Sequence, residues 1–246
     1  MRRTLLALTA GALLGAPVAP AAADPRLEAR LAGCQTAVAP EGRSATFRAS
    51  MPRVPGAARL AMRFSLRQRL GALGLLRPVR VPGWDRWETA SAQRAGLVFT
   101  KKVEALAAPA AYRAVVRFRW LDERGRVLRE TVRRTRTCRQ PDPRPDLRPG
   151  EVEAVPAGDG ARYRIGVHND GLEPAGAFGV VLVIDGTALP RAVVDRVGGG
   201  QRATVEVLGP RCAPGSRITV RVDPEDAVAE PHEGDNAARP SCPLGA

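Results

Sequence analysis

The chain has 246 residues, a formal net charge of +13, 44% hydrophobic residues and four cysteines. That hydrophobic content argues against a disordered chain, and 25 glycines and 22 prolines with 4% aromatic residues favour short strands and turns over long helices. Residues 24–149 hold 27 Arg or Lys against 11 Asp or Glu, whereas residues 150–246 hold 9 against 14. This uneven charge predicts two domains, of which the front one attracts anionic partners or the acidic back half.

Residues 1–23 have the organisation of a secretory signal peptide. Arg2 and Arg3 precede an apolar run over residues 5–18, and small residues follow up to Ala23. The alternative is an N-terminal membrane anchor, but the run is shorter than the roughly 20 residues that a span requires. We therefore expect cleavage near Ala23 and a secreted, extracellular or envelope-associated protein whose mature chain has no transmembrane segment.

The four cysteines predict two disulfides. Cys34 and Cys138 bracket the front half, while Cys212 and Cys242 both lie in the back half. An even number of cysteines in an exported chain indicates disulfides, and pairing within each domain is the simplest of the three connectivities. The alternative for Cys34 is lipid modification, because residues 31–34 look like a lipobox, although charged residues separate them from the apolar run.

Two stretches of the front half alternate between apolar residues and arginines. Residues 112–120 carry apolar side chains at every second position from Tyr112 to Trp120, and residues 59–70 repeat the pattern. Because strand side chains alternate between faces, each stretch is predicted to lay one face on a core and an arginine face in solvent. A tight turn is predicted over residues 122–126, a return strand over 127–138, and shorter strands over 45–49 and 97–106.

The approach to the second alternating stretch resembles the tyrosine corner of fibronectin type III and other immunoglobulin-like sandwiches. Leu106 and Tyr112 lie six residues apart, with Pro109 between them. In that corner the Tyr hydroxyl bonds to nearby backbone where a strand begins. The resemblance implies an immunoglobulin-like β-sandwich over residues 24–140.

Alternate prolines over residues 141–149 predict a stiff linker, because proline excludes both helix and central strand. Beyond it, residues 150–246 are predicted to form a second domain. Strands are predicted over residues 163–169, 178–184, 203–207 and 218–222, each rich in β-branched or aromatic residues. The predicted fold class is thus all-β, with two immunoglobulin-like sandwiches in tandem.

Four turn motifs mark the back half, namely Asn169-Asp170-Gly171, Val183-Ile184-Asp185-Gly186, Gly198-Gly199-Gly200 and the closing string over residues 223–236. Together these turns resemble those of the CARDB family, the cell-adhesion-related domain found in bacteria. The resemblance covers about residues 146–240. It implies a seven-stranded sandwich on exported bacterial proteins, generally an adhesive or accessory module without catalysis.

We find no catalytic or cofactor motif. The acidic residues from Asp223 to Asn236 offer hard oxygen ligands for calcium, but they lack the spacing of an EF-hand, and a solvated loop that ends a strand is the simpler interpretation. His168 and His232 have no Cys or His neighbour at zinc spacing. No serine lies in a Gly-x-Ser-x-Gly elbow. The prediction is a non-enzyme without metal or other cofactor.

One feature of the front half points to a ligand. Arginines on two adjacent predicted strands form a candidate anion-binding patch, namely Arg113, Arg117, Arg119, Arg129, Arg133, Arg134 and Arg136. The alternative is coding bias, because 36 arginines stand against two lysines throughout the chain. Nucleic acid is a poor partner, because the protein is exported and the aromatic side chains alternate inward, away from any base.

The sequence therefore predicts an exported, non-catalytic binding or adhesion module that engages protein or an anionic envelope polymer. The alternative from another class is a structural spacer or stalk without a ligand of its own. A more distant alternative is an accessory to an envelope hydrolase. The sequence does not indicate an oligomeric state.

Overall fold

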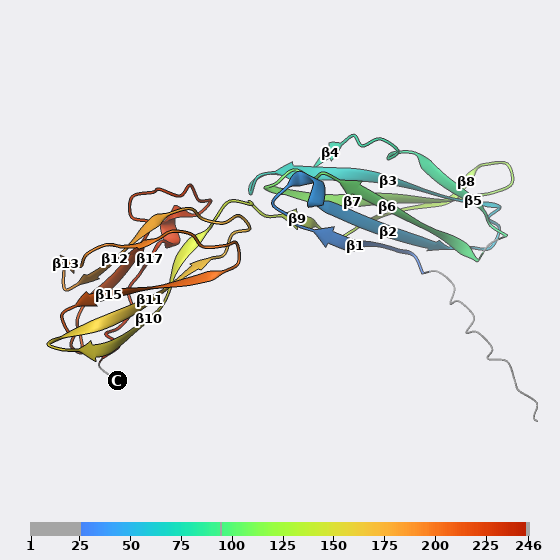
Figure 1. The fold of residues 1–246 in the computed structure, drawn as a ribbon. Helices are drawn as coiled ribbons and strands as arrows, with labels where there is room; N and C mark the ends of the chain where they lie inside the picture. The colour runs from blue at the N-terminus through green and yellow to red at the C-terminus, as the bar shows by residue number, and fades with distance from the viewer. Residues whose placement is uncertain (1–25, 94, 245–246) are drawn as a thin grey trace, which may run out of the picture.

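The computed structural model describes residues 26–93 and 95–244. The signal peptide predicted over residues 1–23 lies outside these residues. Figure 1 shows two lobes built of strands, joined near residue 140. Within the described residues there are two 3-10 turns but no α-helix, and accordingly no helix that is long and apolar enough to cross a membrane. The predicted fold class, all-β with two immunoglobulin-like sandwiches in tandem, is confirmed.

The front sandwich consists of two antiparallel sheets. One has the order β1-β2-β6, and the other has the order β4-β3-β7-β8, with β5 also paired to β3 and β9 to β7. The strands are β1 (Glu28–Gln35), β2 (Ser44–Pro52), β3 (Arg59–Leu70), β4 (Arg77–Val79), β5 (Trp87–Ser91), β6 (Gly96–Glu104), β7 (Ala110–Leu121), β8 (Val127–Arg134) and β9 (Cys138–Gln140). The strands predicted over residues 59–70 and 112–120 are thus confirmed as β3 and β7.

The front core lies between these sheets and follows the predicted alternation. Phe64, Phe118 and Trp120 are fully buried, and the Trp120 indole N–H donates to the Pro52 carbonyl at 2.8 Å. The predicted tyrosine corner is present, because the Tyr112 hydroxyl donates to the Ala107 carbonyl at 3.2 Å. An apolar face therefore packs inward, and the arginines of β3 and β7 are left on the other face.

The return strand predicted over residues 127–138 is interrupted at residues 135–137. β8 ends at Arg134, and the chain then bends before β9 pairs with the opposite end of β7. Thr135 makes the bend: its N–H donates to the Ala114 carbonyl at 3.0 Å, and its hydroxyl accepts the Ala114 N–H at 3.1 Å. Because these bonds continue the pairing of β7 through a side chain, the strand can break without leaving β7 unpaired.

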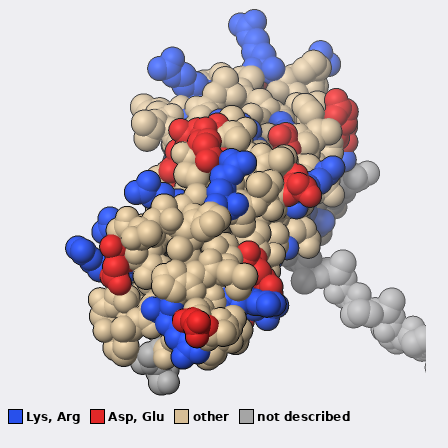
Figure 2. All heavy atoms as spheres, turned by 60° about the vertical axis from the view of Figure 1, so that its left-hand side comes forward, with Lys and Arg blue, Asp and Glu red and all other residues tan. Residues whose placement is uncertain are grey.

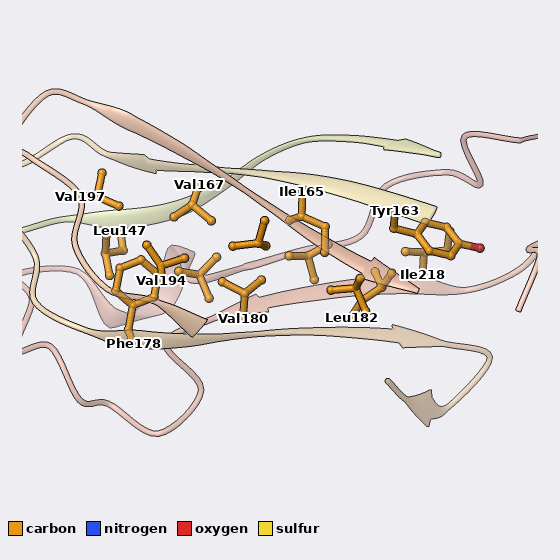
Figure 3. Close-up of a cluster of buried hydrophobic side chains, with 14 of the residues drawn as sticks. Leu147, Tyr163, Ile165, Val167, Phe178, Val180, Leu182, Val194, Val197 and Ile218 are labelled. Atoms are coloured by element: carbon orange, nitrogen blue, oxygen red, sulfur yellow. The ribbon is translucent and has the colours of Figure 1, made fainter. Parts of the chain in front are cut away.

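The back sandwich has the same construction. One sheet has the order β10-β11-β15, and the other has the order β13-β12-β16-β17, with β14 also paired to β12. The strands are β10 (Leu147–Ala157), β11 (Gly160–Asn169), β12 (Phe178–Ile184), β13 (Thr187–Ala188), β14 (Ala192–Val194), β15 (Arg202–Gly209), β16 (Ile218–Val222) and β17 (Ala237–Ala238). Figure 3 shows Tyr163, Ile165 and Val167 of β11 facing Val180 and Leu182 of β12 across the core.

The turn motifs of the back half hold this sandwich together. Asn169 is fully buried, and its side-chain oxygen accepts the N–H groups of Asp146 and Gly171 at 3.1 and 3.0 Å. Its side-chain nitrogen donates to the carbonyls of Glu173 and Val197 at 2.8 and 3.2 Å. One amide thus connects the linker, its own turn and the segment before the Gly198 turn.

The linker predicted over residues 141–149 is shorter than expected. Leu147 already begins β10, so the last three residues of the predicted linker belong to the back sheet. The remainder is attached to the back domain, since Asp170 donates its N–H to the Asp146 carbonyl at 2.7 Å and Glu173 donates to that of Pro143 at 2.8 Å. We propose domain limits of 24–140 and 147–246, with residues 141–146 as the connection.

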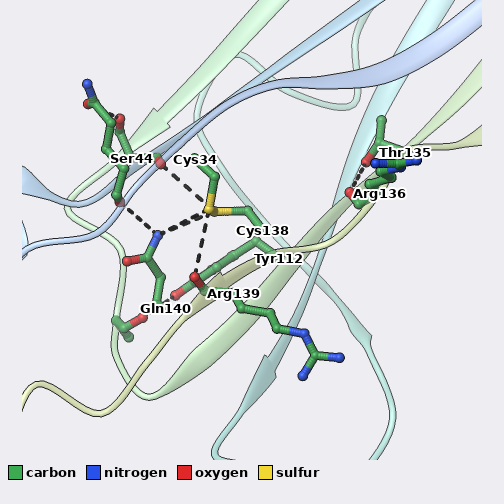
Figure 4. Close-up of a disulfide and its surroundings, with 10 residues drawn as sticks. Cys34, Ser44, Tyr112, Thr135, Arg136, Cys138, Arg139 and Gln140 are labelled. Atoms are coloured by element: carbon green, nitrogen blue, oxygen red, sulfur yellow. Dashed lines mark hydrogen bonds between the residues drawn. A yellow bond between two sulfur atoms is a disulfide. The ribbon is translucent and has the colours of Figure 1, made fainter. Parts of the chain in front are cut away.

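The cysteines form disulfides within each half, Cys34 with Cys138 and Cys212 with Cys242. Figure 4 shows the first, which joins β1 to β9 beside the buried Gln140. The Gln140 side-chain amide donates to the Gln35 carbonyl at 2.9 Å, so the bond and the amide fasten the same pair of strands. A Cys34 held in this bond has no thiol left for lipid attachment.

Candidate functional site

The outer face of the six-stranded sheet is the candidate site. The register of β3 and β7 sets Arg63 opposite Arg117, and Arg67 opposite Arg113, while Ala61 lies opposite Arg119. Directly opposed residues share a face, and the intervening residues of both strands fill the core, so these arginines all point to solvent. We call the group the arginine face; it consists of Arg59, Arg63, Arg67, Arg113, Arg117 and Arg119.

Arginines placed directly opposite one another repel, so the face needs compensating contacts. Trp87 on β5 supplies one, because the guanidinium carbons of Arg119 and Arg63 lie 4.5 and 5.0 Å from its ring centroid. The small side chain of Ala61 leaves room for the Trp87 ring between them. Glu130 on β8 supplies the other, with its carboxylate 2.5 Å from Arg119 Nε and 3.5 Å from Arg117 Nη1.

These contacts leave positive charge uncompensated. The hydrogen bond from Arg119, together with the charges of Arg119, Arg117 and Arg63, holds the pKa of Glu130 below its usual range. Glu130 therefore stays ionised and offsets one charge. The Arg63 Nε is buried and has no acceptor among the residues that the structure describes.

A hollow of about 190 Å³ opens in the arginine face. It is lined by Arg63, Arg67 and Arg117, together with Ser65 and with Asp85, whose carboxylate accepts a hydrogen bond from the Ser65 hydroxyl. Guanidinium groups around a shallow hollow suit a carboxylate, phosphate or sulfate group, which they bind through paired N–H donors. The nearby Trp87 ring adds a flat apolar surface beside the charges. The arrangement fits an anionic ligand.

The predicted patch of seven arginines is wrong as a single surface. Arg113, Arg117 and Arg119 do lie on the arginine face, and Arg134 shares it because it pairs with Val115. Arg129 and Arg133 pair with Trp120 and Val116, so they point to the opposite side of the sheet. Arg136 lies beyond β8, in the bend before β9. The reason is the alternation of β8 itself, which sends neighbouring arginines to opposite faces.

Arg63, Arg67 and Trp87 belong to the site but are not among the arginines predicted from the sequence. The sequence shows that the arginines of residues 59–70 share one face of a strand, but alternation does not reveal which strand lies beside β7. The predicted neighbour in sequence, β8, does pair with β7, but β3 pairs with its other edge along the whole strand from Ala110 to Leu121. That pairing joins residues about 50 positions apart.

The acidic loop of the back domain serves the chain itself. The Asp223 carboxylate accepts the N–H groups of Ala227 and Val228 at 3.0 and 2.8 Å. The Glu230 carboxylate accepts the Leu147 N–H and, at 3.0 Å, the Asn236 side-chain amide. Both carboxylates are buried, and burial raises the pKa of Glu230 to about 7. Among the described residues there is no group of three His, Cys, Asp or Glu side chains placed to hold a metal ion.

Neither histidine belongs to a catalytic arrangement in the described residues. His168 lies in a trough of about 520 Å³ on the outer face of the β10-β11-β15 sheet, and its pKa is lowered by burial and by the nearby Arg202 and Arg148. The Nδ1 atom of His232 lies 3.3 Å from the Asp146 carboxylate, in the exposed acidic loop.

Comparison with known proteins finds one family model that matches the back domain. The CARDB family model matches residues 144–240, which confirms the resemblance predicted from the turn motifs. Among curated proteins, none matches the chain.

Three solved structures are similar to parts of the chain. A domain of a cell surface protein from Methanosarcina acetivorans has 26% identity and a TM-score of 0.35, and covers 40% of this chain and 90% of its own. The CARDB domain of a Pyrococcus furiosus protein, in complex with di-metal ions, has 26% identity, a TM-score of 0.34, and coverage of 40% and 86%. Red sea bream transglutaminase has 10% identity and a TM-score of 0.35, with coverage of 82% of this chain and 29% of its own.

Proposed function

Because residues 144–240 match the CARDB family, we propose that the protein is an exported, non-catalytic binding module of the adhesion type. Two disulfides support export, since such bonds persist in oxidising compartments outside the cytoplasm. In this proposal the ligand is an anionic component of the cell envelope, and the arginine face of the front domain binds it.

The observation that carries the proposal is the register of β3 and β7. It brings Arg63 beside Arg117 and Arg67 beside Arg113, a repulsion that Trp87 and Glu130 offset only in part and that a bound anion would relieve. Coding bias explains why arginine is used in place of lysine. It does not explain why like charges are paired across two strands around a hollow.

Salt-dependent retention on isolated envelope material tests the proposal. We expect the mature chain to be retained at low ionic strength and released as salt rises, because salt screens exposed charges beyond a Debye length of about 10 Å at 0.1 M. The triple variant Arg63→Ser, Arg67→Ser, Arg117→Ser is expected to lose most of this retention. Replacement of the same three residues by Lys keeps the charge and should keep a large part of it.

The matched control is the triple variant Arg129→Ser, Arg133→Ser, Arg136→Ser. It removes the same charge from the same domain, but from outside the arginine face. Retention equal to that of the wild type is expected, with thermal unfolding used to confirm that all variants fold. Equal losses in both triple variants would mean that net charge alone drives the attachment, and the proposed site would be wrong.

A structural spacer remains the second candidate, and the connection between the domains favours it. Residues 141–146 are bonded to the back domain through Asp146 and Pro143, which stiffens the join. A spacer predicts no salt-dependent retention in the experiment above, so one measurement separates the two functions.

A further inference from the structure

An exposed group of leucines lies in the connection between β3 and β4. Leu70, Leu73 and Leu75 expose 64, 89 and 84% of their surface. Single exposed leucines are common on proteins, but three within six residues form a contiguous apolar tip, which marks an interaction site. We call residues 70–76 the leucine loop.

The loop is held out from the body of the domain by its backbone. Gly71 and Gly74 have φ values of +70° and +99°, and no atom lies within 4 Å of the position where either would carry a Cβ. The Gly71 N–H donates to the Pro109 carbonyl at 2.8 Å, which anchors the base of the loop to the start of β7. The leucines therefore project beyond this anchor and are not part of the front core.

Arginines surround the base of the leucine loop. Arg67 and Arg69 precede it and Arg77 and Arg80 follow it, and residues 59–84 contain no Asp or Glu. Arg67 also belongs to the arginine face, and its guanidinium lies 3.5 Å from the Leu76 carbonyl inside the loop. The basic surface and the apolar tip are thus continuous. In Figure 2, Lys and Arg side chains project from the upper part of the molecule, the side on which the front lobe lies.

Exposed leucines with arginines at their base suit the interface of a bilayer that contains anionic lipids. There the leucines enter the boundary of the acyl chains while the arginines stay among the headgroups. A wall polysaccharide would use the arginines and leave the leucines in water. A second copy of the chain would bury the leucines but bring like charges together.

We propose that the leucine loop inserts into the surface of an anionic lipid bilayer, with the arginine face lying against the headgroups. The inference rests on the proposed function, since both use the arginine face, and it names the anionic component as lipid. It adds a group of residues that an attachment through charge alone would not need.

Sedimentation of the mature chain with vesicles tests the inference. The vesicles are phosphatidylcholine alone, or phosphatidylcholine with about a third phosphatidylglycerol, and a soluble polyphosphate serves as an anion without a bilayer. We expect binding to the anionic vesicles and none to the neutral ones. The double variant Leu73→Asn, Leu75→Asn should weaken vesicle binding by roughly tenfold or more, because its side chains no longer gain from leaving water. Its binding to polyphosphate should equal that of the wild type.

Two further variants make the result specific. Leu208→Asn changes another exposed leucine, which at 64% matches Leu70 but lies on β15 of the back domain, and it should bind vesicles like the wild type. Leu75→Trp keeps an apolar side chain in the loop. The wild type already has three tryptophans, so the fluorescence of the added tryptophan is read as the difference between the spectra of the variant and the wild type. This difference emission should shift to shorter wavelength with anionic vesicles only.

The failures of the two proposals are distinguishable. If the double asparagine variant binds vesicles as well as the wild type does, the leucine loop does not insert. The same holds if the wild type binds polyphosphate but no vesicles. Either result leaves anion binding by the arginine face in place. Absence of binding to both vesicles and polyphosphate refutes both. A wild-type dimer in light scattering that the asparagine variant dissociates would assign the loop to a second copy and overturn the bilayer.

Discussion

The two domains arrange the charges on their outer sheets in different ways. In the back domain, Arg164 lies 3.7 Å from Glu153 and 3.5 Å from Glu206, so the solvent face of β11 meets opposite charge on both neighbouring strands. In the front domain, the corresponding face of β3 and β7 sets arginine against arginine. A face that satisfies its own charges has little to offer a charged partner. A face whose arginines repel one another is stabilised when an anion binds to it.

The domains also differ in what specifies their folds. The back domain contains buried polar groups, Asn169, Asp223 and Glu230, which bond to backbone at its turns. The front domain also buries polar groups that bond to backbone, among them Thr135 and Gln140. It adds the aromatic contacts of Trp84 with Phe47 and Phe64 and a disulfide across a long loop. The front domain is therefore the more dependent on its disulfide.

Removal of the disulfides should have the largest effect and should fall more heavily on the front domain. Cys34 and Cys138 are 104 residues apart, against 30 for Cys212 and Cys242. In the chain-entropy model, the first bond contributes about 4 to 5 kcal/mol to the free energy of unfolding and the second about 3 to 4. Chemical denaturation of the two double Cys→Ser variants measures both values.

The tryptophans allow the two domains to be observed separately. All three, Trp84, Trp87 and Trp120, lie in the front domain, so fluorescence reports its unfolding, while circular dichroism reports both domains. If loss of the back disulfide shifted the fluorescence transition as much as loss of the front one, the domains would not be independent units.

Asn169→Ala should be the most damaging single polar substitution. It removes four hydrogen bonds and leaves the buried N–H of Gly171 without its acceptor, at a cost of about 2 to 4 kcal/mol in the stability of the back domain. Thermal unfolding followed by circular dichroism should show the loss, with the fluorescence transition unchanged. The adjacent exposed Asp170→Ala is the control and should change stability by less than about 1 kcal/mol.

The two domains should respond to pH in opposite directions. The pKa of Glu230 rises from 4.5 to about 7 on folding, so between these values the folded state holds a proton that the unfolded state has released. The back domain should therefore lose stability as pH rises from about 4.5 to about 7, by on the order of 1 to 3 kcal/mol. Glu230→Gln should remove this slope, and a slope that persists in that variant would exclude Glu230 as its source.

In the front domain, the pKa values of Glu130 and Asp122 are lowered by Arg119 and Arg126 respectively. The stability that these carboxylates contribute is present above their ordinary pKa values and is lost as pH falls through their lowered ones. The stability of the front domain, followed by tryptophan fluorescence, should accordingly fall only under acid conditions. A loss of its stability as pH falls from 7 to 5 would contradict the ion pairs as described.

The smallest effect is expected from Glu130→Gln, which removes the carboxylate that offsets Arg117 and Arg119. Affinity for an anionic ligand should rise by about twofold, because one more charge of the arginine face becomes available. Glu206→Gln, which releases arginines of the back domain, should leave that affinity unchanged. Binding to polyphosphate at fixed salt gives both values, and an equal rise in both variants would mean that the back domain binds as well.

The features that could be predicted from the sequence are those encoded within a short stretch. Alternation defined β3 and β7, because the period of two is a property of each strand alone. The spacing of Leu106, Pro109 and Tyr112 was enough to predict the tyrosine corner, and the four turn motifs of the back half together were enough for the CARDB resemblance. The disulfide pairing was predicted correctly because each domain contains two cysteines.

The features that could not be predicted depend on which strands become neighbours. The partner of Arg117 proved to be Arg63, more than 50 residues away, because pairing between strands is non-local. The residue at which β8 ends depended on Thr135, whose hydroxyl replaces a strand bond with a side-chain bond, and the pattern of apolar residues does not locate that exchange. The leucine loop did have a signature, four leucines in residues 70–76 between arginines, but only its exposure in the fold distinguishes it from a core strand.

The most direct test of the account is a salt titration of polyphosphate binding with the two charge-matched triple variants. We predict that the variant lacking Arg63, Arg67 and Arg117 has both a weaker affinity and a shallower dependence on salt than the wild type. The variant lacking Arg129, Arg133 and Arg136 should match the wild type in both. If the two variants behave alike, the arginine face is no more than part of a uniform positive charge, and the distinction drawn between the two domains is wrong.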